Sequence, residues 1–308
     1  MRKIGVLVVT YNQFDMMAQW IKRFREMFGD QGNICLLVLD NNSRDGSYSK
    51  LRRMFPETDI RKLKENYGCT TGRNIGILEL DKLGCEFYTS CDTDVFIENE
   101  RYFAKLSDAM NQNPTVDGFC PVLRWEEDNT IQGLGARRAW HGGLKTVREI
   151  TGNRDVDCLP GGANFIRMSA FKKYGLYDNN LPPIGSQDYE WGLRARKLGA
   201  KFQYWPEVEA IHRHRKAAGC APWTKKWVLM GRIIVLRKHF SLGNLIREIS
   251  YAIFNVKEFG IREMVSAYWE GMKKMLDDEN YNFEAFKTKG AEDYYDEEYR
   301  RNKMGNGR

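Results

Sequence analysis

The first hundred residues alternate short strand-type runs with helical segments, and this alternation limits the folds open to the chain. The strand-type runs are Ile4–Val9, Ile34–Leu39, Ile60–Leu63 and Glu86–Cys91. The segments with helical spacing of apolar residues are Met16–Met27, Leu51–Phe55 and Thr71–Leu83. Strands separated by helices form a mostly parallel sheet with helices on its faces. We therefore expect an α/β fold that binds its ligand at the carboxyl ends of the strands.

Polar clusters follow these strands at the points where ligands would bind. They are Thr10-Tyr11-Asn12, Asp40-Asn41-Asn42-Ser43, Asn66-Tyr67-Gly68 and Asp92-Thr93-Asp94. Two carboxylates at the end of a buried strand repel each other and lose hydration, so Asp92 and Asp94 need a counter-charge. A divalent cation supplies one and can hold nucleotide phosphates at the same time. Such triplets are also common in solvated turns, so the motif acquires meaning only from the motifs around it.

Other nucleotide-binding folds lack their sequence motifs here. The turn Thr10–Asp15 after the first strand contains no glycine, which argues against a dinucleotide-binding Rossmann domain. Neither a phosphate-binding loop of the G-x-x-x-x-G-K-[ST] type nor a G-x-S-x-G nucleophile elbow occurs in the sequence.

The order of the motifs resembles glycosyltransferase family 2, whose members are inverting enzymes of the GT-A fold that use nucleotide-sugars. The matching segments are Val8–Asn12, Val38–Ser47, Asn66–Gly68, Gly72–Ile77, Asp92–Asp94, Gly161–Asn164, Gly175–Asp178, Gln187–Arg194 and His212. The part after residue 215 resembles the rhamnosyltransferase-like branch more loosely. The resemblance implies a GT-A catalytic domain over residues 1–218, with a nucleotide-binding part (1–98) and an acceptor part (99–218). A helical region (219–295) and a disordered tail (296–308) are expected to follow.

The resemblance also implies a binding site for the nucleotide-sugar donor. Its residues are Thr10, Tyr11, Asn12, Asp40, Asn42, Asn66, Gly68, Arg73, Asp92 and Thr93. Asp40 would accept a hydrogen bond from N3–H of uracil or thymine; a turn-capping role is the structural alternative. Asp92 would contact the ribose or the sugar. Arg73 would contact the diphosphate, with a surface ion pair as its alternative.

The resemblance assigns the metal to Asp94 and a histidine. Asp94 would bind Mn²⁺ or Mg²⁺, and His212, which follows the strand-type run Val208–Ile211, would be the second protein ligand. His214 lies two residues further on and is the competing candidate.

The general base implied by the resemblance is Asp188, where the family has a Glu-Asp pair and this chain has Gln187-Asp188. Gln187 lacks the negative charge that the family's Glu has at this position. This difference affects the acceptor contacts or the proton affinity of Asp188 more than the assignment of Asp188 as the base. Gly161, Gly162, Gln187 and Trp191 would contact the acceptor or the sugar; burial in the core is the alternative for Trp191.

These expectations describe a metal-dependent inverting glycosyltransferase that moves a sugar from a UDP- or dTDP-sugar to a hydroxyl of a glycan or lipid-linked acceptor. Two alternatives stay open. A sugar-nucleotidyltransferase would have a glycine-rich basic loop after its first strand, which Thr10–Asp15 does not provide. A non-catalytic glycan- or lipid-binding protein on the same fold would have no need of the carboxylates Asp94 and Asp188.

Two later segments are expected to be less regular. Arg124–Cys158 is rich in Gly, Arg and Trp, so we expect a loop or short hairpin over the site. Two edge strands, Phe202–Trp205 and Val208–Ile211, are expected to be split by Pro206.

The charge of the chain is concentrated towards its end. The net charge is +7, but Arg213–Leu276 alone holds 13 Lys and Arg against 4 Asp and Glu. Because Trp227, Ile233 and Trp269 interleave with these charges, we expect residues 225–274 to contact an anionic membrane rather than nucleic acid. A solvated helical face is the alternative, and homo-oligomer formation stays open.

Localisation is inferred from what the sequence lacks. No signal peptide and no apolar run of about 20 residues is visible, and the seven cysteines show no C-x-x-C spacing. A reduced, cytoplasmic protein, or one held at the inner face of a membrane, is therefore expected.

Overall fold

The computed structural model describes residues 2–139, 144–213, 222–244, 246, 265–266, 269–270, 273 and 291–296. The helices are α1 (Phe14–Phe28), α2 (Ser47–Met54), α3 (Gly68–Lys82), α4 (Tyr102–Gln112), α5 (Met168–Tyr174), α6 (Gln187–Lys197), α7 (Pro222–His239) and the short 3₁₀ helix η3 (Ala291–Tyr294). The strands are β1 (Ile4–Thr10), β2 (Ile34–Asp40), β3 (Asp59–Lys62), β4 (Phe87–Ser90), β5 (Val95–Phe96), β6 (Gly118–Trp125), β7 (Ile131–Gly133), β8 (Ala136–Arg138), β9 (Leu144–Thr146), β10 (Asp155–Val156), β11 (Phe165–Arg167) and β12 (Phe202–His212).

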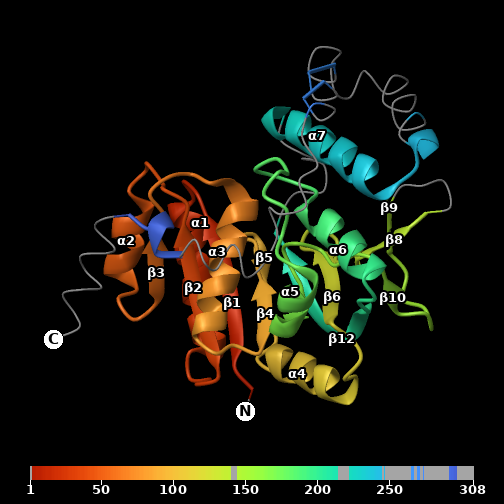
Figure 1. Cartoon of the computed structure of the whole chain (residues 1–308). Helices are drawn as coiled ribbons and strands as arrows, with labels where there is room; N and C mark the ends of the chain where they lie inside the picture. Colours follow the sequence, from red (N-terminus) through yellow and green to blue (C-terminus); the bar gives the residue numbers. More distant parts are fainter. Residues whose placement is uncertain are drawn as a thin grey trace.

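One mixed sheet organises the described residues (Figure 1). It is 10-stranded and runs β10-β12-β6-β11-β4-β1-β2-β3, with β5 paired to β12 and β7 paired to β6. Strands β4, β1, β2 and β3 are parallel, as the alternation in the sequence predicts, whereas β11 is antiparallel to both β4 and β6. The expected α/β fold with a mostly parallel central sheet is confirmed.

The parallel half brings the polar strand ends together. Thr10 at the end of β1 lies beside Asp40 at the end of β2, and Asp40 lies beside Lys62 at the end of β3. Because the strands run in the same direction, the clusters that follow them gather at one edge of the sheet.

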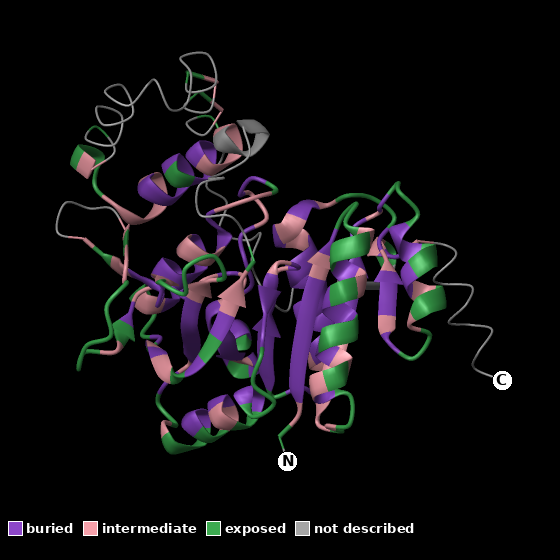
Figure 2. Ribbon diagram, turned by 180° about the vertical axis from the view of Figure 1, so that it is seen from behind, coloured by how far each residue is buried: buried purple, intermediate pink, exposed green. Residues whose placement is uncertain are grey.

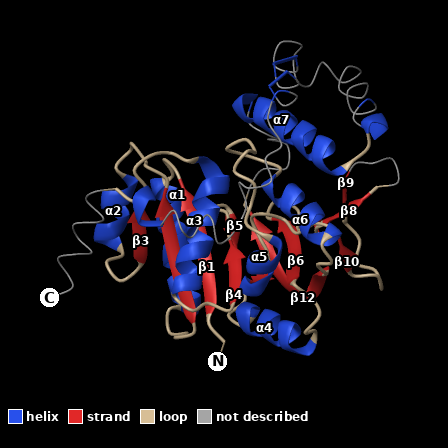
Figure 3. Ribbon diagram, viewed as in Figure 1, coloured by secondary structure: helices blue, strands red, loops and turns tan. Residues whose placement is uncertain are grey.

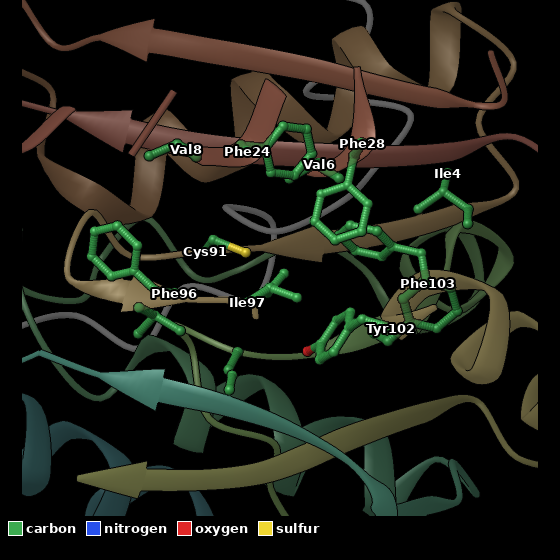
Figure 4. Close-up of a cluster of buried hydrophobic side chains, with 14 of the residues drawn as sticks. Ile4, Val6, Val8, Phe24, Phe28, Cys91, Phe96, Ile97, Tyr102 and Phe103 are labelled. Atoms are coloured by element: carbon green, nitrogen blue, oxygen red, sulfur yellow. The ribbon is translucent and has the colours of Figure 1, made fainter. Parts of the chain in front are cut away.

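Helices cover both faces of the sheet because alternate residues of each strand point to opposite sides. On one face, Val6 and Val8 of β1 pack with residues of α1, α2 and α4. Figure 4 shows Phe24 and Phe28 of α1 in this cluster. On the other face, Leu7 packs with α3, α5 and α6. The central strands are accordingly buried along their length (Figure 2).

Strand β12 corrects one expectation. Residues 202–212 form a single strand that pairs in parallel with β6, rather than two edge strands. The register shifts between Trp205 and Glu209, and Pro206 lies within this irregularity. A proline has no N–H to donate, so the bulge accommodates it without ending the strand.

The described part of Arg124–Cys158 forms short hairpins, which is one of the two outcomes expected for it. It contributes β7, which forms a hairpin with β6, and the separate two-stranded sheet of β8 and β9. Helix α4 was not predicted. Its apolar residues, including Tyr102 and Phe103, complete the cluster around α1 (Figure 4).

Helix α7 is a packed cap on α6 (Figure 3). Ile233, Ile234 and Leu236 are buried in a cluster with Leu193 of α6. They are therefore not available for the membrane contact that the sequence predicts for residues 225–274. Trp269, by contrast, is 63% exposed. None of the helices in the described ranges is both long and apolar enough to cross a bilayer. Most of residues 240–290 and all of 297–308, the larger part of the expected helical region and tail, lie outside the described residues.

Candidate active site

Asp40 is a buried carboxylate at the carboxyl edge of the sheet. Its side chain is fully buried, and Oδ1 accepts a hydrogen bond from the Ser43 backbone N–H at 2.7 Å. Oδ2 is buried without a hydrogen-bond partner. Burial raises the pKa of Asp40, while the hydrogen bonds from Ser43 and the charge of Lys62 oppose the rise. An unsatisfied buried acceptor is costly and therefore suits an N–H donor supplied by a ligand.

The loop after β1 is tied to the loop after β2. Asn12 has a left-handed backbone (φ +53°), and its N–H donates to Ser43 Oγ at 2.9 Å. The Arg44 N–H donates to Asn12 Oδ1 at 2.8 Å. Thr10 Oγ1 is buried without a partner, whereas Tyr11 is 37% exposed. Thr10, Tyr11 and Asn12 therefore line the same edge as Asp40.

Asn42, Asn66 and Gly68 shape the backbone on the other side of Asp40. Asn42 (φ +64°) donates through Nδ2 to the Lys64 carbonyl at 2.8 Å. Asn66 Oδ1 accepts from the Gly68 N–H at 3.0 Å, which closes a turn at the start of α3. Gly68 has φ +78°, and a Cβ there would lie 2.6 Å from Pro183 Cβ, so both conformation and space require glycine.

The Asp92–Asp94 turn is held at three points. The Asp92 N–H donates to the Gly162 carbonyl at 3.3 Å, and the Val95 N–H donates to the Asp92 carbonyl at 3.0 Å. The Thr93 hydroxyl donates to Gln13 Oε1 at 3.0 Å. The turn is thereby fixed to the loop after β1 and to the glycine pair.

Asp92 is paired with Arg73 at the bottom of the site. Arg73 Nη2 lies 2.8 Å from Asp92 Oδ1, and the Arg73 side chain is only 4% exposed, so the pair is not the surface ion pair considered from the sequence. Nη1 of Arg73 is buried without a hydrogen-bond partner. A Cβ at Gly161 would lie 2.6 Å from Nη1, and a Cβ at Gly162 would collide with Asp92 Oδ2. The two glycines therefore make room for this ion pair.

Asp94 faces His212 across the pairing of β5 with β12. His212 lies opposite Val95 in the register, and its Nε2 is 3.2 Å from Asp94 Oδ2. The Arg213 N–H donates to the Asp94 carbonyl at 2.7 Å, which fixes the backbone between the two side chains. The competing residue His214 lies outside the described residues.

The orientation of His212 is set by two residues that the sequence did not indicate for this role. Its Nδ1 lies 2.8 Å from Gln132 Oε1, and its ring stacks on Trp125 with centroids 5.4 Å apart. Because a carbonyl oxygen only accepts, Nδ1 of His212 is the ring nitrogen that donates to Gln132, and Nε2 is the ring nitrogen that faces Asp94.

The Asp94–His212 pair fits a divalent cation. Two ligands at about 2.1 Å from an octahedral ion lie about 3 Å apart, close to the observed separation. Among the described residues, no group of three or more His, Cys, Asp and Glu side chains converges on a metal position. The described protein ligands are therefore two at most at this position.

Asp188 is the second residue of α6 and is held by Gly161. Its Oδ2 accepts from the Gly161 N–H at 3.0 Å, and Ser186, which precedes the helix, has φ +69°. Burial raises the pKa of Asp188, and the charge of Arg73 opposes the rise. Gln187 Oε1 is buried without a partner. Asp188, Arg73 and Gly161 thus belong to one constellation.

Trp191 does not line the site. It is 2% exposed, its Nε1 donates to the Gly175 carbonyl at 2.7 Å, and its ring packs against Phe171, Tyr177 and Phe202. The prediction that Trp191 contacts a sugar or acceptor is wrong, because the large apolar ring is buried in the core.

The helix that carries Asp188 is anchored by a buried charge network. Glu190 lies 3.0 Å from Arg194, 3.4 Å from Lys238 and 3.3 Å from His239. Burial alone would raise the pKa of Glu190, but these partners lower it to about 2. Lys238 also lies 2.8 Å from Asp178, whose side chain is 1% exposed. Glu190 and Arg194 lie one turn apart on α6, whereas Lys238 and His239 of α7 are far from Glu190 in the sequence and reach it only in the folded protein.

The sheet, with the Asp-x-Asp turn after its central strand β4, has the arrangement of the GT-A fold, and the sequence family defines the protein as a glycosyltransferase. The chain belongs to glycosyl transferase family 2, whose profile matches residues 5–175. It is similar to N-acetylglucosaminyl-diphospho-decaprenol L-rhamnosyltransferase of Mycobacterium tuberculosis, with 22% identity over 71% of this chain and 78% of the relative.

Solved structures share the fold. GalNAc-T7 with UDP, GalNAc and Mn²⁺ aligns with a TM-score of 0.64 and 17% identity over 89% of this chain; the chain spans 56% of that protein. TarS 1–349 from S. aureus with UDP-GlcNAc aligns with a TM-score of 0.59 and 14% identity, over 88% of this chain and 81% of TarS. The mannosyltransferase PcManGT from Pyrobaculum calidifontis, with GDP-Man and Mn²⁺, aligns with a TM-score of 0.54 and 15% identity, over 88% of this chain and 74% of PcManGT.

Proposed function

We propose that the protein is a metal-dependent inverting glycosyltransferase that moves a sugar from a UDP- or dTDP-sugar to a hydroxyl of a glycan or lipid-linked acceptor. The observation that carries the proposal is the pair formed by Asp94 and His212, whose facing atoms lie 3.2 Å apart. Mn²⁺ or Mg²⁺ held there would act as a Lewis acid towards the diphosphate of the donor. Mn²⁺ is favoured, because Mg²⁺ takes oxygen ligands and His212 offers nitrogen.

The donor would lie along the strand ends, with its base at Asp40. The unpartnered Oδ2 of Asp40 accepts from N3–H of uracil or thymine, which satisfies a group that is otherwise buried without a partner. Arg73 is neutralised on one side by Asp92 and retains an unpartnered Nη1. It therefore contributes positive potential next to the departing diphosphate, without a direct contact being required.

Asp188 would be the general base. The acceptor oxygen forms a bond to the anomeric carbon as the bond from that carbon to the diphosphate breaks, and the acceptor proton passes to a carboxylate oxygen of Asp188. The nucleoside diphosphate leaves with the electron pair of the broken bond. The Gly161 N–H holds Oδ2 of Asp188, and burial raises the pKa of the carboxyl, which makes it a stronger proton acceptor once ionised.

The acceptor side is proposed from the relative and from the surface. The mycobacterial relative is named for transfer of rhamnose to a lipid-diphosphate-linked sugar, which supports a lipid-linked acceptor and a deoxyhexose donor. Leu242, Ile246 and Trp269 are 71%, 56% and 63% exposed within the basic segment 225–274. We assign the proposed contact with an anionic membrane to these three exposed side chains rather than to the packed helix α7.

The test is product analysis with UDP- and dTDP-sugars in the presence of Mn²⁺. A glycosyltransferase releases UDP or dTDP, even when water replaces the acceptor, whereas a sugar-nucleotidyltransferase turns over these donors only with added pyrophosphate and then releases UTP or dTTP and a sugar 1-phosphate. Donor turnover that persists in EDTA would contradict the role of the metal. Donor binding without any product from every acceptor class tested would support the non-catalytic alternative.

A further inference from the structure

A segment near the end of the chain lies on the edge of the sheet opposite to α7. Figure 1 draws η3 in dark blue beside β3, whereas α7 lies above α6. Tyr295 forms an antiparallel bridge with Leu63, the Lys64 N–H donates to the Tyr294 carbonyl at 2.9 Å, and the Asp296 N–H donates to the Lys62 carbonyl at 3.0 Å. We call residues Tyr294–Asp296 the strap. It covers an edge that β3 would otherwise leave unpaired.

The strap is buried against the protein as a built contact. Tyr295 is 3% exposed and belongs to the main core cluster. Its hydroxyl lies 3.3 Å from Arg61 Nη1, and the Arg61 guanidinium, which is ion-paired with Glu79, also lies 5.7 Å from the centre of the Tyr295 ring. A docked segment with this burial opposes fraying of the edge strand.

The backbone that the strap holds is the backbone beside Asp40. The Leu63 N–H donates to the Asp40 carbonyl at 2.9 Å, and the Lys64 carbonyl accepts from Asn42. Lys64 is thus fixed on one side by the strap and on the other by the loop after β2. Tyr67, further along the same segment, donates its backbone N–H to Asn41 Oδ1 at 3.0 Å.

Side chains make a second connection. The ring of Tyr294 packs edge-on against Tyr67, with centroids 5.1 Å apart and planes at 81°. Lys62 lies 3.8 Å from Asp296, and its charge also acts on Asp40. The strap therefore contacts both ends of the segment 62–67.

We propose that the strap positions the segment 62–67 as the wall of the nucleobase subsite, with Tyr294 and Tyr295 as positioning residues for the donor nucleotide. The proposal rests on the function proposed above, in which Asp40 receives the base. It assigns to a segment more than two hundred residues from Asp40 a role in donor affinity rather than in the chemical step. It also places the strap on the donor side and α7 on the side of Asp188.

The experiment measures binding of UDP and dTDP, each with MnCl₂, by calorimetry. The variant Tyr294→Ala removes the edge-on contact and Tyr294→Phe keeps it; a chain ending at residue 290 lacks the strap, and one ending at 296 retains it. We expect Tyr294→Ala to weaken nucleotide binding roughly two- to tenfold, as loss of an aromatic pair does, and the chain ending at 290 to weaken it further. Tyr294→Phe and the chain ending at 296 should bind like the intact protein.

Three further readouts separate positioning from general loss of structure. In Tyr294→Ala, the KM for the donor should rise while kcat and the affinity for Mn²⁺ with pyrophosphate stay unchanged. The reason is that neither the proposed metal ligands nor the proposed general base, Asp188, contacts the strap. The proposed role of the strap is overturned if Tyr294→Ala binds the nucleotide as tightly as the intact protein does. It is also overturned if Tyr294→Ala lowers kcat alone. Tyr294→Ala decides the question if the chain ending at 290 does not fold. An intact protein that binds neither nucleotide refutes the proposed function instead.

Discussion

Nε2 of His212 lies 3.2 Å from Oδ2 of Asp94, although 117 positions separate the two residues in the chain. The pairing of β12 with β5 places them there, and neither strand was expected to join the other. The closeness of an imidazole nitrogen and a carboxylate oxygen is the basis for the first two predictions.

Removing either ligand should abolish metal-dependent donor binding. Asp94→Ala and His212→Ala each take away one of two described protein ligands, so calorimetry should show that Mn²⁺ no longer strengthens binding of UDP or dTDP. The far-ultraviolet dichroism should stay native, because both side chains are partly exposed. If His212→Ala keeps full Mn²⁺ dependence, His214 or another group holds the metal.

Gln132 should matter through His212. Gln132→Ala removes the acceptor that fixes the imidazole, so the apparent affinity for Mn²⁺ should fall by roughly 10- to 100-fold, the usual effect of losing such a partner. Gln132→Glu retains an acceptor at the same reach and should restore most of the affinity. A direct measurement is the Mn²⁺ titration followed by electron paramagnetic resonance; equal affinities in all three proteins would contradict this role.

Asp188→Asn should slow sugar transfer strongly and leave donor binding unchanged. The amide keeps the shape but cannot take a proton, so kcat should fall by roughly 10²- to 10⁴-fold. Burial raises the pKa of Asp188, so in the intact protein kcat/KM should decline as the pH falls through a value above 3.8, where the carboxyl becomes protonated.

The same substitution has a consequence for stability. A carboxyl whose pKa is raised in the folded state binds protons more tightly there, so its ionised form destabilises the fold at neutral pH. Thermal unfolding of Asp188→Asn should therefore occur at the same temperature or higher. A lower melting temperature, or normal turnover, would argue against a buried base.

Lys238 should anchor α7. Lys238→Met leaves the carboxylates of Asp178 and Glu190 buried with one cation fewer, and breaking such a pair typically costs about 3–5 kcal/mol in the free energy of unfolding. The double variant with Asp178→Asn should recover part of the loss. Lys172→Met is the control, because Lys172 is 49% exposed in its pair with Asp81 and such pairs contribute at most about 1 kcal/mol.

The network also predicts a pH dependence for α7. Glu190 has a pKa lowered to about 2, so the stabilisation from its ionised form is present above the ordinary value of 4.5 and is lost as the pH falls towards 2. Burial lowers the pKa of His239, so acid also destabilises the folded state below the ordinary value of 6.5. Denaturant unfolding between pH 7 and pH 3 should show the intact protein losing more stability than Lys238→Met.

The sequence by itself determined the parallel half of the sheet and the polar groups at its edge. Periods of apolar residues are local, and a strand that ends in Asp40, or one that is followed by Asp92, carries that residue to the carboxyl edge wherever the sheet forms. The order of the motifs was equally sufficient for the family, because order along the chain is all that a resemblance requires.

Contacts between distant segments were decided only by the tertiary structure. Trp191 was expected at the sugar, but nothing local distinguishes a stacking ring from a core ring; the cluster with Phe171 and Phe202 made it core. Gln132 reaches His212 through a hairpin whose register depends on β6. The strap pairs with Leu63 across more than two hundred residues. Sequence patterns predict which residues are buried and where turns form. Which distant residues contact one another depends on the surfaces that the folded sheet brings together.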